Sequence, residues 1–191
     1  MNANKITAAE ALEKLKDGNK KYISAEVPCG NISPVIRRQT CENGQTPYAV
    51  IVSCSDSRVI PENIFSAGIG ELFVIRVAGN VIDKHQLGSI EYAVEHLGSP
   101  LVLVLGHNHC GAVNAAIHPG ESRFIKYITD EIRSAIGTET DDLKACCLNV
   151  QHAVQVIEDS IDIQTMQQKF GLQVCGAVYH IENGEVEFLS E

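Results

Sequence analysis

The sequence predicts an α/β fold, with a mainly parallel central β-sheet flanked by helices and a C-terminal antiparallel hairpin at one edge. Two apolar runs rich in β-branched residues, 48–53 and 100–107, have the composition of buried strands, and "ELFVIRV" (71–77) reads as a further strand between them. Helical patterns alternate with these runs, as in strand–helix–strand units. Near the C-terminus, "LQVCGAVYHIENGEVEFL" reads as two strands joined by an Asn-Gly turn, which predicts the hairpin.

Helices are expected before and between the strands. Residues 8–23 have apolar side chains at helical spacing, with charged residues between them, which predicts an amphipathic helix. A loop containing Pro28, Gly30 and Pro34 should follow, and then a short helix near 35–41. The remaining expected helices are one or two turns opening at Pro61, a helix over 85–98, one within 110–117, and two or three pieces from 122 to about 160, broken near 137–141.

The length of 191 residues fits a single domain, 1–191, in which 1–45 form an N-terminal helical arm and 46–191 the α/β core. The formal net charge of −9 argues against nucleic acid or an anionic membrane as partner, because both prefer basic surfaces. No apolar run approaches the roughly 20 residues of a membrane span, and no signal-peptide core opens the chain, so a cytoplasmic location is expected. Seven cysteines then favour thiols, metal ligands or catalysis over a disulfide framework.

Polar residues follow the first predicted strand in the stretch "VSCSDSR". Cys54, Asp56 and Arg58 occupy alternate positions and would share one face if the strand continued. Burying such a trio is costly without a function. In open α/β sheets the site lies outside the carboxyl ends of the strands, where both Cys54 and His107 fall.

The stretch "GHNHCGAV" supplies the other half of a candidate metal site. Cys54, His107 and Cys110 make a soft three-ligand set that suits Zn²⁺ and leaves one tetrahedral position open, as in catalytic zinc sites. His109 creates a competing H-x-H pattern, but Gly106 and the glycine after Cys110 indicate that the strand has already ended. The competing interpretation, in which the thiols pack in the core and the Asp–Arg pair lies on the surface, requires four coincidences at strand ends.

Several blocks together resemble the β-class carbonic anhydrases: "GQTPYAVIVSCSDSRV", "GELFVIRVAGNV", "GSIEYAV" and "GHNHCGAV". The resemblance extends from "ALEKLKDGNKKY" to "GAVYHIENGEVEFL", and therefore over nearly the whole chain. It implies a mostly parallel α/β sheet with the active site at a dimer interface. The implied activity is the zinc-dependent, reversible hydration of CO₂ to bicarbonate, with one Zn²⁺ per chain in a homodimer or homotetramer.

The resemblance also implies a role for each matching residue. Cys54, His107 and Cys110 match the zinc ligands, and Asp56 and Arg58 match the catalytic Asp–Arg dyad. The substrate-binding positions are matched by the orienting glutamine Gln45, by Phe73 and Tyr92 of the apolar CO₂ pocket, and by Gly111, whose N–H faces the substrate.

Other functions remain open from the sequence. Relatives on the same scaffold hydrolyse COS or CS₂ with the same zinc set, and one sequence does not reveal the pocket access that decides between these substrates. A zinc-holding module without turnover is a further alternative, although it would need neither the Asp56–Arg58 dyad nor Gln45. His109 is either a proton shuttle or an exposed bystander.

Overall fold

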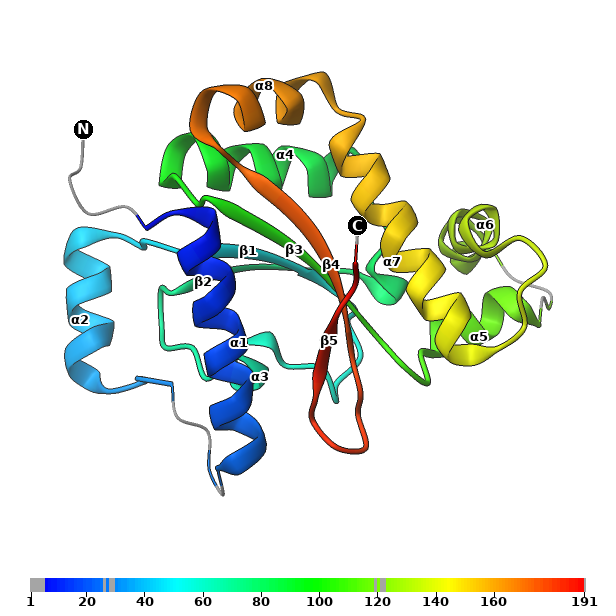
Figure 1. The fold of residues 1–191 in the computed structure, drawn as a ribbon, viewed down its shortest axis with the longest axis horizontal. Coiled ribbons are helices and arrows are strands. Elements are labelled where there is room, and N and C mark those ends of the chain that lie inside the picture. Colours follow the sequence, from blue (N-terminus) through cyan, green and yellow to red (C-terminus); the bar gives the residue numbers. More distant parts are fainter. Residues whose placement is uncertain (1–5, 26, 28–29, 119, 121–122, 191) are drawn as a thin grey trace.

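A computed structural model describes residues 6–25, 27, 30–118, 120 and 123–190. In this part of the chain five strands form one sheet in the order β2-β1-β3-β4-β5 (Figure 1). The first four strands run parallel, which confirms the predicted sheet and its three apolar strands. Their bounds are Ala49–Ser53 (β1), Leu72–Arg76 (β2), Leu101–His107 (β3), Gln173–Tyr179 (β4) and Val186–Phe188 (β5).

The C-terminal hairpin lies at the sheet edge, as predicted. β5 pairs antiparallel with β4, and Tyr179 lies opposite Val186. The connection is longer than a two-residue Asn-Gly turn, because the His180 N–H still donates to the Glu185 carbonyl at 2.8 Å. Gly184 within the loop has φ +82°, a left-handed conformation that a side chain disfavours.

Most helices begin and end at the expected residues. Thr7 and Glu10 form a capping box at the start of α1, and Pro61 opens α3. The break expected between 137 and 141 separates α6 from α7. The bounds are Ala8–Ser24 (α1), Pro34–Asn43 (α2), Pro61–Ile64 (α3), Lys84–Tyr92 (α4), Gly111–Ile117 (α5), Ile125–Ile136 (α6), Asp142–Glu158 (α7) and Ile161–Phe170 (α8), with a 3₁₀ turn Ala78–Asn80 (η1) and a π-helical segment Ala93–Leu97 (η2).

Three details differ from the sequence expectations. α8 was not predicted, and the helix expected over 85–98 is divided into α4 and η2. Pro28, in the expected loop, and Cys29 lie outside the described residues. No helix in the described ranges combines the length and the apolar character needed to cross a membrane.

The central strands β1 and β3 are almost entirely apolar and fully buried because both faces of the sheet are covered. Val52 and Val104 point to the face packed by α4, α7 and α8, whereas Ile51 and Leu103 point to the face packed by α1 and α3. All four side chains are fully buried. The continuous apolar runs in the sequence follow from this sandwich of helices.

α1 is fixed to the rest of the molecule by a buried asparagine. The Asn19 Nδ2 donates to the carbonyls of Ile64 (3.3 Å) and Gly184 (2.9 Å), and the Val186 N–H donates to Asn19 Oδ1 (3.0 Å). The neighbouring Gly18 allows close contact with α3, because a Cβ there would lie 2.0 Å from the Phe65 carbonyl oxygen. α1 therefore joins the start of the chain to the C-terminal hairpin.

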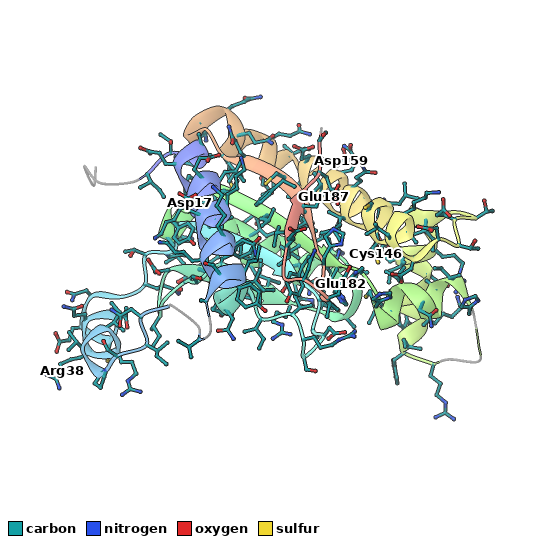
Figure 2. The ribbon with its side chains drawn as sticks, turned by 60° about the horizontal axis from the view of Figure 1, so that its bottom comes forward. Asp17, Arg38, Cys146, Asp159, Glu182 and Glu187 are labelled. Carbon is teal, nitrogen blue, oxygen red and sulfur yellow. The ribbon has the colours of Figure 1, made fainter. Side chains whose placement is uncertain are left out.

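α2 contrasts with α1 because it has no buried residue. Figure 1 places α2 at the opposite end of the long molecular axis from α5 and α6. In Figure 2, Arg38 projects from α2 at one end of the molecule, far from Cys146 on α7. In one chain, α2 covers neither face of the sheet.

Candidate functional site

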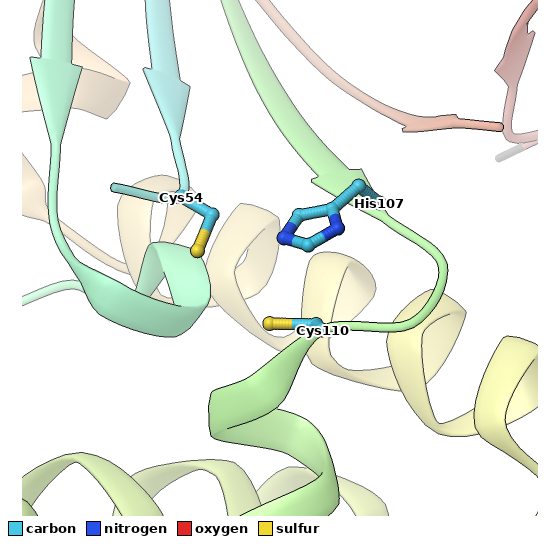
Figure 3. A group of neighbouring side chains, drawn as sticks. All are labelled: Cys54, His107 and Cys110. Atoms are coloured by element: carbon cyan, nitrogen blue, oxygen red, sulfur yellow. The ribbon is translucent and has the colours of Figure 1, made fainter. Parts of the chain in front are cut away.

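Three side chains meet where β1 and β3 end. The strands are parallel neighbours, so Cys54, directly after β1, lies near His107 at the end of β3. Cys110 follows in the short turn before α5. Their ligand atoms all lie within 4.8 Å of one another, and all three residues are buried (Figure 3). This separation is of the order that one ion with bonds of about 2.0–2.3 Å can span.

The histidine ring is oriented for metal binding. His107 Nδ1 lies 2.8 Å from the Asn108 carbonyl oxygen, to which it donates in the tautomer that leaves Nε2 unprotonated. Nε2 is buried and makes no hydrogen bond to any residue that the structure describes. An orphaned buried nitrogen is costly unless a ligand satisfies it, and the two neighbouring sulfur atoms make a metal ion the fitting ligand.

The two thiols of the cluster interact directly. A hydrogen bond between them lowers the pKa of Cys54 and raises the pKa of Cys110. Cys146 lies behind them in the same packed cluster, and burial raises its pKa to about 12. Cys146 is therefore a protonated packing residue, while Cys54 and Cys110 offer the sulfur ligands.

The structure brings Cys110, and not His109, to the cluster. β3 ends at His107, and His109 adopts φ +53°, which turns its side chain away. The His109 ring is 69% exposed, and its Nδ1 lies 3.5 Å from Asp142 Oδ2. The change in backbone direction at His109 removes the shared face on which the H-x-H alternative depended.

Asp56 and Arg58 form a tight ion pair beside the cluster. Arg58 Nε and Nη2 donate to the two carboxylate oxygens at 2.9 and 2.7 Å. These hydrogen bonds hold the pKa of Asp56 well below its usual range. Asp56 Oδ2 lies 3.9 Å from His107 Nε2, so the ionised carboxylate faces the metal-binding atoms. The pair lies in a turn, because β1 ends at Ser53 and does not continue as a strand.

Two residues that support this loop were not identified from the sequence. Arg76 donates from Nε to the Cys54 carbonyl (3.1 Å) and from Nη2 to the Asp56 carbonyl (2.7 Å). The Gly79 N–H lies 3.3 Å from Cys54 Sγ, to which it donates. A charged residue closing the apolar run "ELFVIR" was the available signal for Arg76, whereas the backbone donor at Gly79 leaves no signal in side-chain identity.

The predicted pocket residues do not join the cluster within one chain. Gln45 precedes β1 and Cys54 follows it, so the five residues of this strand alone separate them by about 16 Å. Phe73 on the edge strand β2 packs against Tyr92, with ring centroids 6.1 Å apart. Tyr92 is 47% exposed. The chain thus separates these three residues from the metal-binding atoms.

Gly111 lies next to the cluster, as the first residue of α5. A Cβ added there would meet no atom within 4 Å. The glycine is therefore not required by packing within this chain, in contrast to Gly18. The space that a side chain would occupy at Gly111 is therefore open among the described residues.

The comparisons with known proteins agree with this geometry. A family model described as carbonic anhydrase matches residues 49–186. A carbonic anhydrase of Mycolicibacterium smegmatis is 37% identical over 202 aligned positions, covering 99% of this chain and 95% of that protein. The β-carbonic anhydrase CafA of Aspergillus fumigatus superposes with a TM-score of 0.77 at 26% identity, covering 95% of this chain and 90% of that one.

A second solved structure extends the likeness in fold. It is one of two β-carbonic anhydrases described as tetrameric, from Sordaria macrospora, and it superposes with a TM-score of 0.73 at 24% identity. That comparison covers 82% of this chain and 92% of the other. The family match, the full-length relative and the shared fold lead to one conclusion: the chain belongs to the β-carbonic anhydrase family.

Proposed function

We propose that this protein catalyses the zinc-dependent, reversible hydration of CO₂ to bicarbonate and a proton. The observation that carries the proposal is the buried Cys54–His107–Cys110 cluster with an ionised carboxylate facing it. A structural metal site needs no such carboxylate, and an ordinary ion pair needs no adjacent ligand set. The family relationship supports the same activity.

Cys54, His107 and Cys110 would hold the zinc through two sulfur atoms and His107 Nε2. When bound, zinc supplies a Lewis acid that lowers the pKa of water to about 7 in the three-histidine carbonic anhydrase site, the standard example of this chemistry. Two thiolates and one neutral imidazole suit this metal and leave one of its four positions for water or substrate. The buried and otherwise unpartnered His107 Nε2 is the atom of this structure that most directly fits the assignment.

Asp56 and Arg58 would orient the attacking water. Both carboxylate oxygens of Asp56 accept from Arg58, so the carboxylate cannot turn freely. Because its pKa is depressed, Asp56 accepts a hydrogen bond from water without taking the proton. Arg58 also donates to the His109 carbonyl (3.2 Å), which ties the dyad to the turn that carries Cys110.

The substrate side of the site requires further groups. The Gly111 N–H and the Gln45 carboxamide would donate to oxygen as negative charge develops on the forming bicarbonate. Phe73 and Tyr92 would provide an apolar wall for an uncharged gas. Since Gln45, Phe73 and Tyr92 lie away from this chain's own cluster, we propose that they line the site of a second copy.

A homodimer or homotetramer follows from that placement. α2 has no buried residue; Val35 in its first turn is 63% exposed, and Ile32 just before the helix is 71% exposed. β2 forms an open edge of the sheet within the described part of the chain. The tetrameric Sordaria relatives support an assembly of this kind, and pairing around a two-fold axis is the common arrangement.

The test combines metal content with turnover. Purified protein should contain one zinc per chain and accelerate CO₂ hydration, with loss of activity on chelation and recovery on adding Zn²⁺. Parallel assays with COS and CS₂ identify the preferred substrate. Zinc-loaded protein that turns over none of the three would be a binding module, and the proposed function would be wrong.

A further inference from the structure

We infer that one face of α7 positions the two turns that carry the metal ligands, and that Asn149 and Asp142 are its positioning residues. The inference rests on the proposed zinc site. It concerns Asp142, Cys146 and Asn149, which stand at i, i+4 and i+7 and therefore share one side of the helix. Cys146 packs in the same buried cluster as Cys54 and Cys110, so this side of α7 faces the site.

α7 packs directly on the strand that delivers the histidine. A Cβ at Gly106 would lie 2.4 Å from Val150 Cγ2, so the glycine allows the helix to approach the end of β3. β3 and α7 are also in extensive contact. A helix held this close can fix the turn that follows the strand.

The first connection passes through Asn149 to Cys54. The buried Asn149 Nδ2 donates to the Gly79 carbonyl oxygen at 2.8 Å, across 70 residues of sequence. The N–H of the same Gly79 donates to Cys54 Sγ at 3.3 Å. Asn149 thus holds the residue whose N–H donates to the thiolate, through the peptide group on the other side of its Cα.

Gly79 adopts the left-handed conformation, with φ +70°, which glycine reaches without strain and a side chain would disfavour. A Cβ at this position would lie 2.7 Å from Ile132 Cδ1, so the turn is also tightly enclosed. A hydrogen bond to a ligand sulfur reduces the charge that the sulfur donates to a metal. The position of Gly79 therefore affects the metal, and Asn149 sets that position.

The second connection passes through Asp142 to the turn between His107 and Cys110. Asp142 Oδ2 accepts from the His109 N–H at 2.8 Å, across 33 residues. His109 is a non-glycine residue at φ +53°, a conformation that needs support from outside the turn. Its carbonyl in turn accepts from Arg58 Nη2 at 3.2 Å. Asp142 therefore holds the peptides that lie between the histidine ligand, the second cysteine and the dyad.

The test for Asn149 uses Asn149→Leu, which keeps the branched shape and removes the donor. Metal-free protein is titrated with Co²⁺, and the thiolate-to-cobalt charge-transfer band is recorded; zinc affinity is measured by competition with a chelator. We expect a shifted band and zinc binding weakened about 10–100-fold, the usual cost of losing a group that orients a ligand.

Asn19→Leu is the matched control. Asn19 is also a buried asparagine that donates to backbone carbonyls, but it joins α1 to the hairpin. It should lower the unfolding midpoint and leave the cobalt spectrum and zinc affinity at wild-type values. Equal spectra and affinities for Asn149→Leu and wild type would overturn the role of Asn149.

Asp142 is tested on an exposed position, where failure to fold is not expected. Asp142→Ala should shift the cobalt spectrum and weaken zinc binding, whereas Asp142→Asn, which keeps an acceptor for the His109 N–H, should restore both. The control is Asp141→Ala, because Asp141 caps the same helix through the Lys144 N–H (3.0 Å) without reaching the site. Identical behaviour of Asp141→Ala and Asp142→Ala would reduce Asp142 to a helix-end residue and overturn its role.

The outcomes separate this inference from the proposed function. Wild-type protein that binds neither Zn²⁺ nor Co²⁺ would contradict the metal site itself. Wild-type protein that binds both, with Asn149→Leu and Asp142→Ala unchanged from it, would leave the proposed function intact and contradict the positioning role of α7.

Discussion

The turns after β1 and β3 and the segment before β1 present their functional residues in opposite ways. The turns bury Cys54, His107 and Cys110 within 4.8 Å of one another, with an ion pair beside them. The segment before β1 carries α2, which has no buried residue, and Gln45, which is exposed. One chain therefore brings together all three proposed metal ligands, whereas the proposed substrate-binding residues lie away from them and would require a second chain.

Removing a ligand should have the largest effect, because one chain brings together all three proposed metal ligands. Cys54→Ser, His107→Ala and Cys110→Ser should each weaken zinc binding by more than about 100-fold, since even groups that orient ligands contribute about 10–100-fold. His109→Ala should retain zinc. Metal analysis after dialysis measures both. Zinc retained in Cys110→Ser and lost in His109→Ala would transfer the ligand role to His109.

Removing the charge of Asp56 should leave zinc binding intact and greatly reduce CO₂ hydration. Asp56→Asn cannot orient water as a carboxylate does, so the hydration kcat/KM should fall about 100-fold or more. Asp17→Asn, on α1, is the matched control, because Asp17 also pairs with a basic residue, Lys20, at 2.9 Å. Asp17→Asn should change activity little. It should also change the folding stability little, because exposed ion pairs contribute about 0–1 kcal/mol to stability. Equal activity in the two variants would show that the Asp56–Arg58 pair is merely structural.

Arg58→Ala tests the other partner of the pair. Without Arg58, the Asp56 carboxylate is free to turn toward the metal-binding atoms, the nearest of which is 3.9 Å away. The variant should retain zinc and lose activity, and X-ray absorption should detect an added carboxylate ligand. A variant with wild-type activity and an unchanged absorption spectrum would contradict this role for Arg58.

A charge introduced on α2, in the N-terminal arm, should lower activity by weakening self-association. Val35→Asp should weaken self-association at least about tenfold, because an interface that buries this exposed side chain would have to bury an unpaired charge. Activity should fall together with the oligomer, at unchanged zinc content. Sedimentation and hydration assays over a concentration series measure this. Ile161→Asp, at a position of similar exposure on α8, is the control. A fully active monomer would refute the shared pocket.

Gly111→Ala should have the smallest effect on the fold. The added methyl group meets nothing in this chain and replaces glycine at a helical position, so stability should stay constant or rise by up to about 1 kcal/mol. Turnover should nevertheless fall several-fold, because the methyl group enters the space proposed for substrate. Thermal unfolding and initial rates measure the two effects. Unchanged turnover would place the substrate elsewhere.

The sequence was sufficient for the features that depend on local pattern. The apolar runs predicted β1 and β3, because strands covered on both faces carry apolar residues at consecutive positions, and β2 was predicted from the apolar residues between Glu71 and Arg76. α8 was missed because its buried residues, Ile163 and Met166, are too few to show a helical period among the glutamines around them.

Some residues of the candidate site could likewise be identified from the sequence, whereas others could not. The thiols and the imidazole at strand ends could be identified because their residue types themselves indicate metal binding. The choice between Cys110 and His109 rested on where β3 ends, and the positive φ of His109 provides the geometric reason. Arg76, Asp142 and Asn149 could not be assigned roles, because their hydrogen bonds reach residues 20 to 70 positions away.

The asparagine that anchors α1 also bears on how the chain reaches its folded state. Asn19 bonds to Gly184 and Val186, which are 165 and 167 residues away, so these are among the least local contacts in the molecule. Contacts of such separation form late, because a long loop must close before they contribute. On the ribosome, Asn19 emerges 165 residues before Gly184, so α1 cannot complete its docking until the hairpin has been synthesised. The apolar face of α1 is thus exposed to other nascent chains while the intervening strands are made.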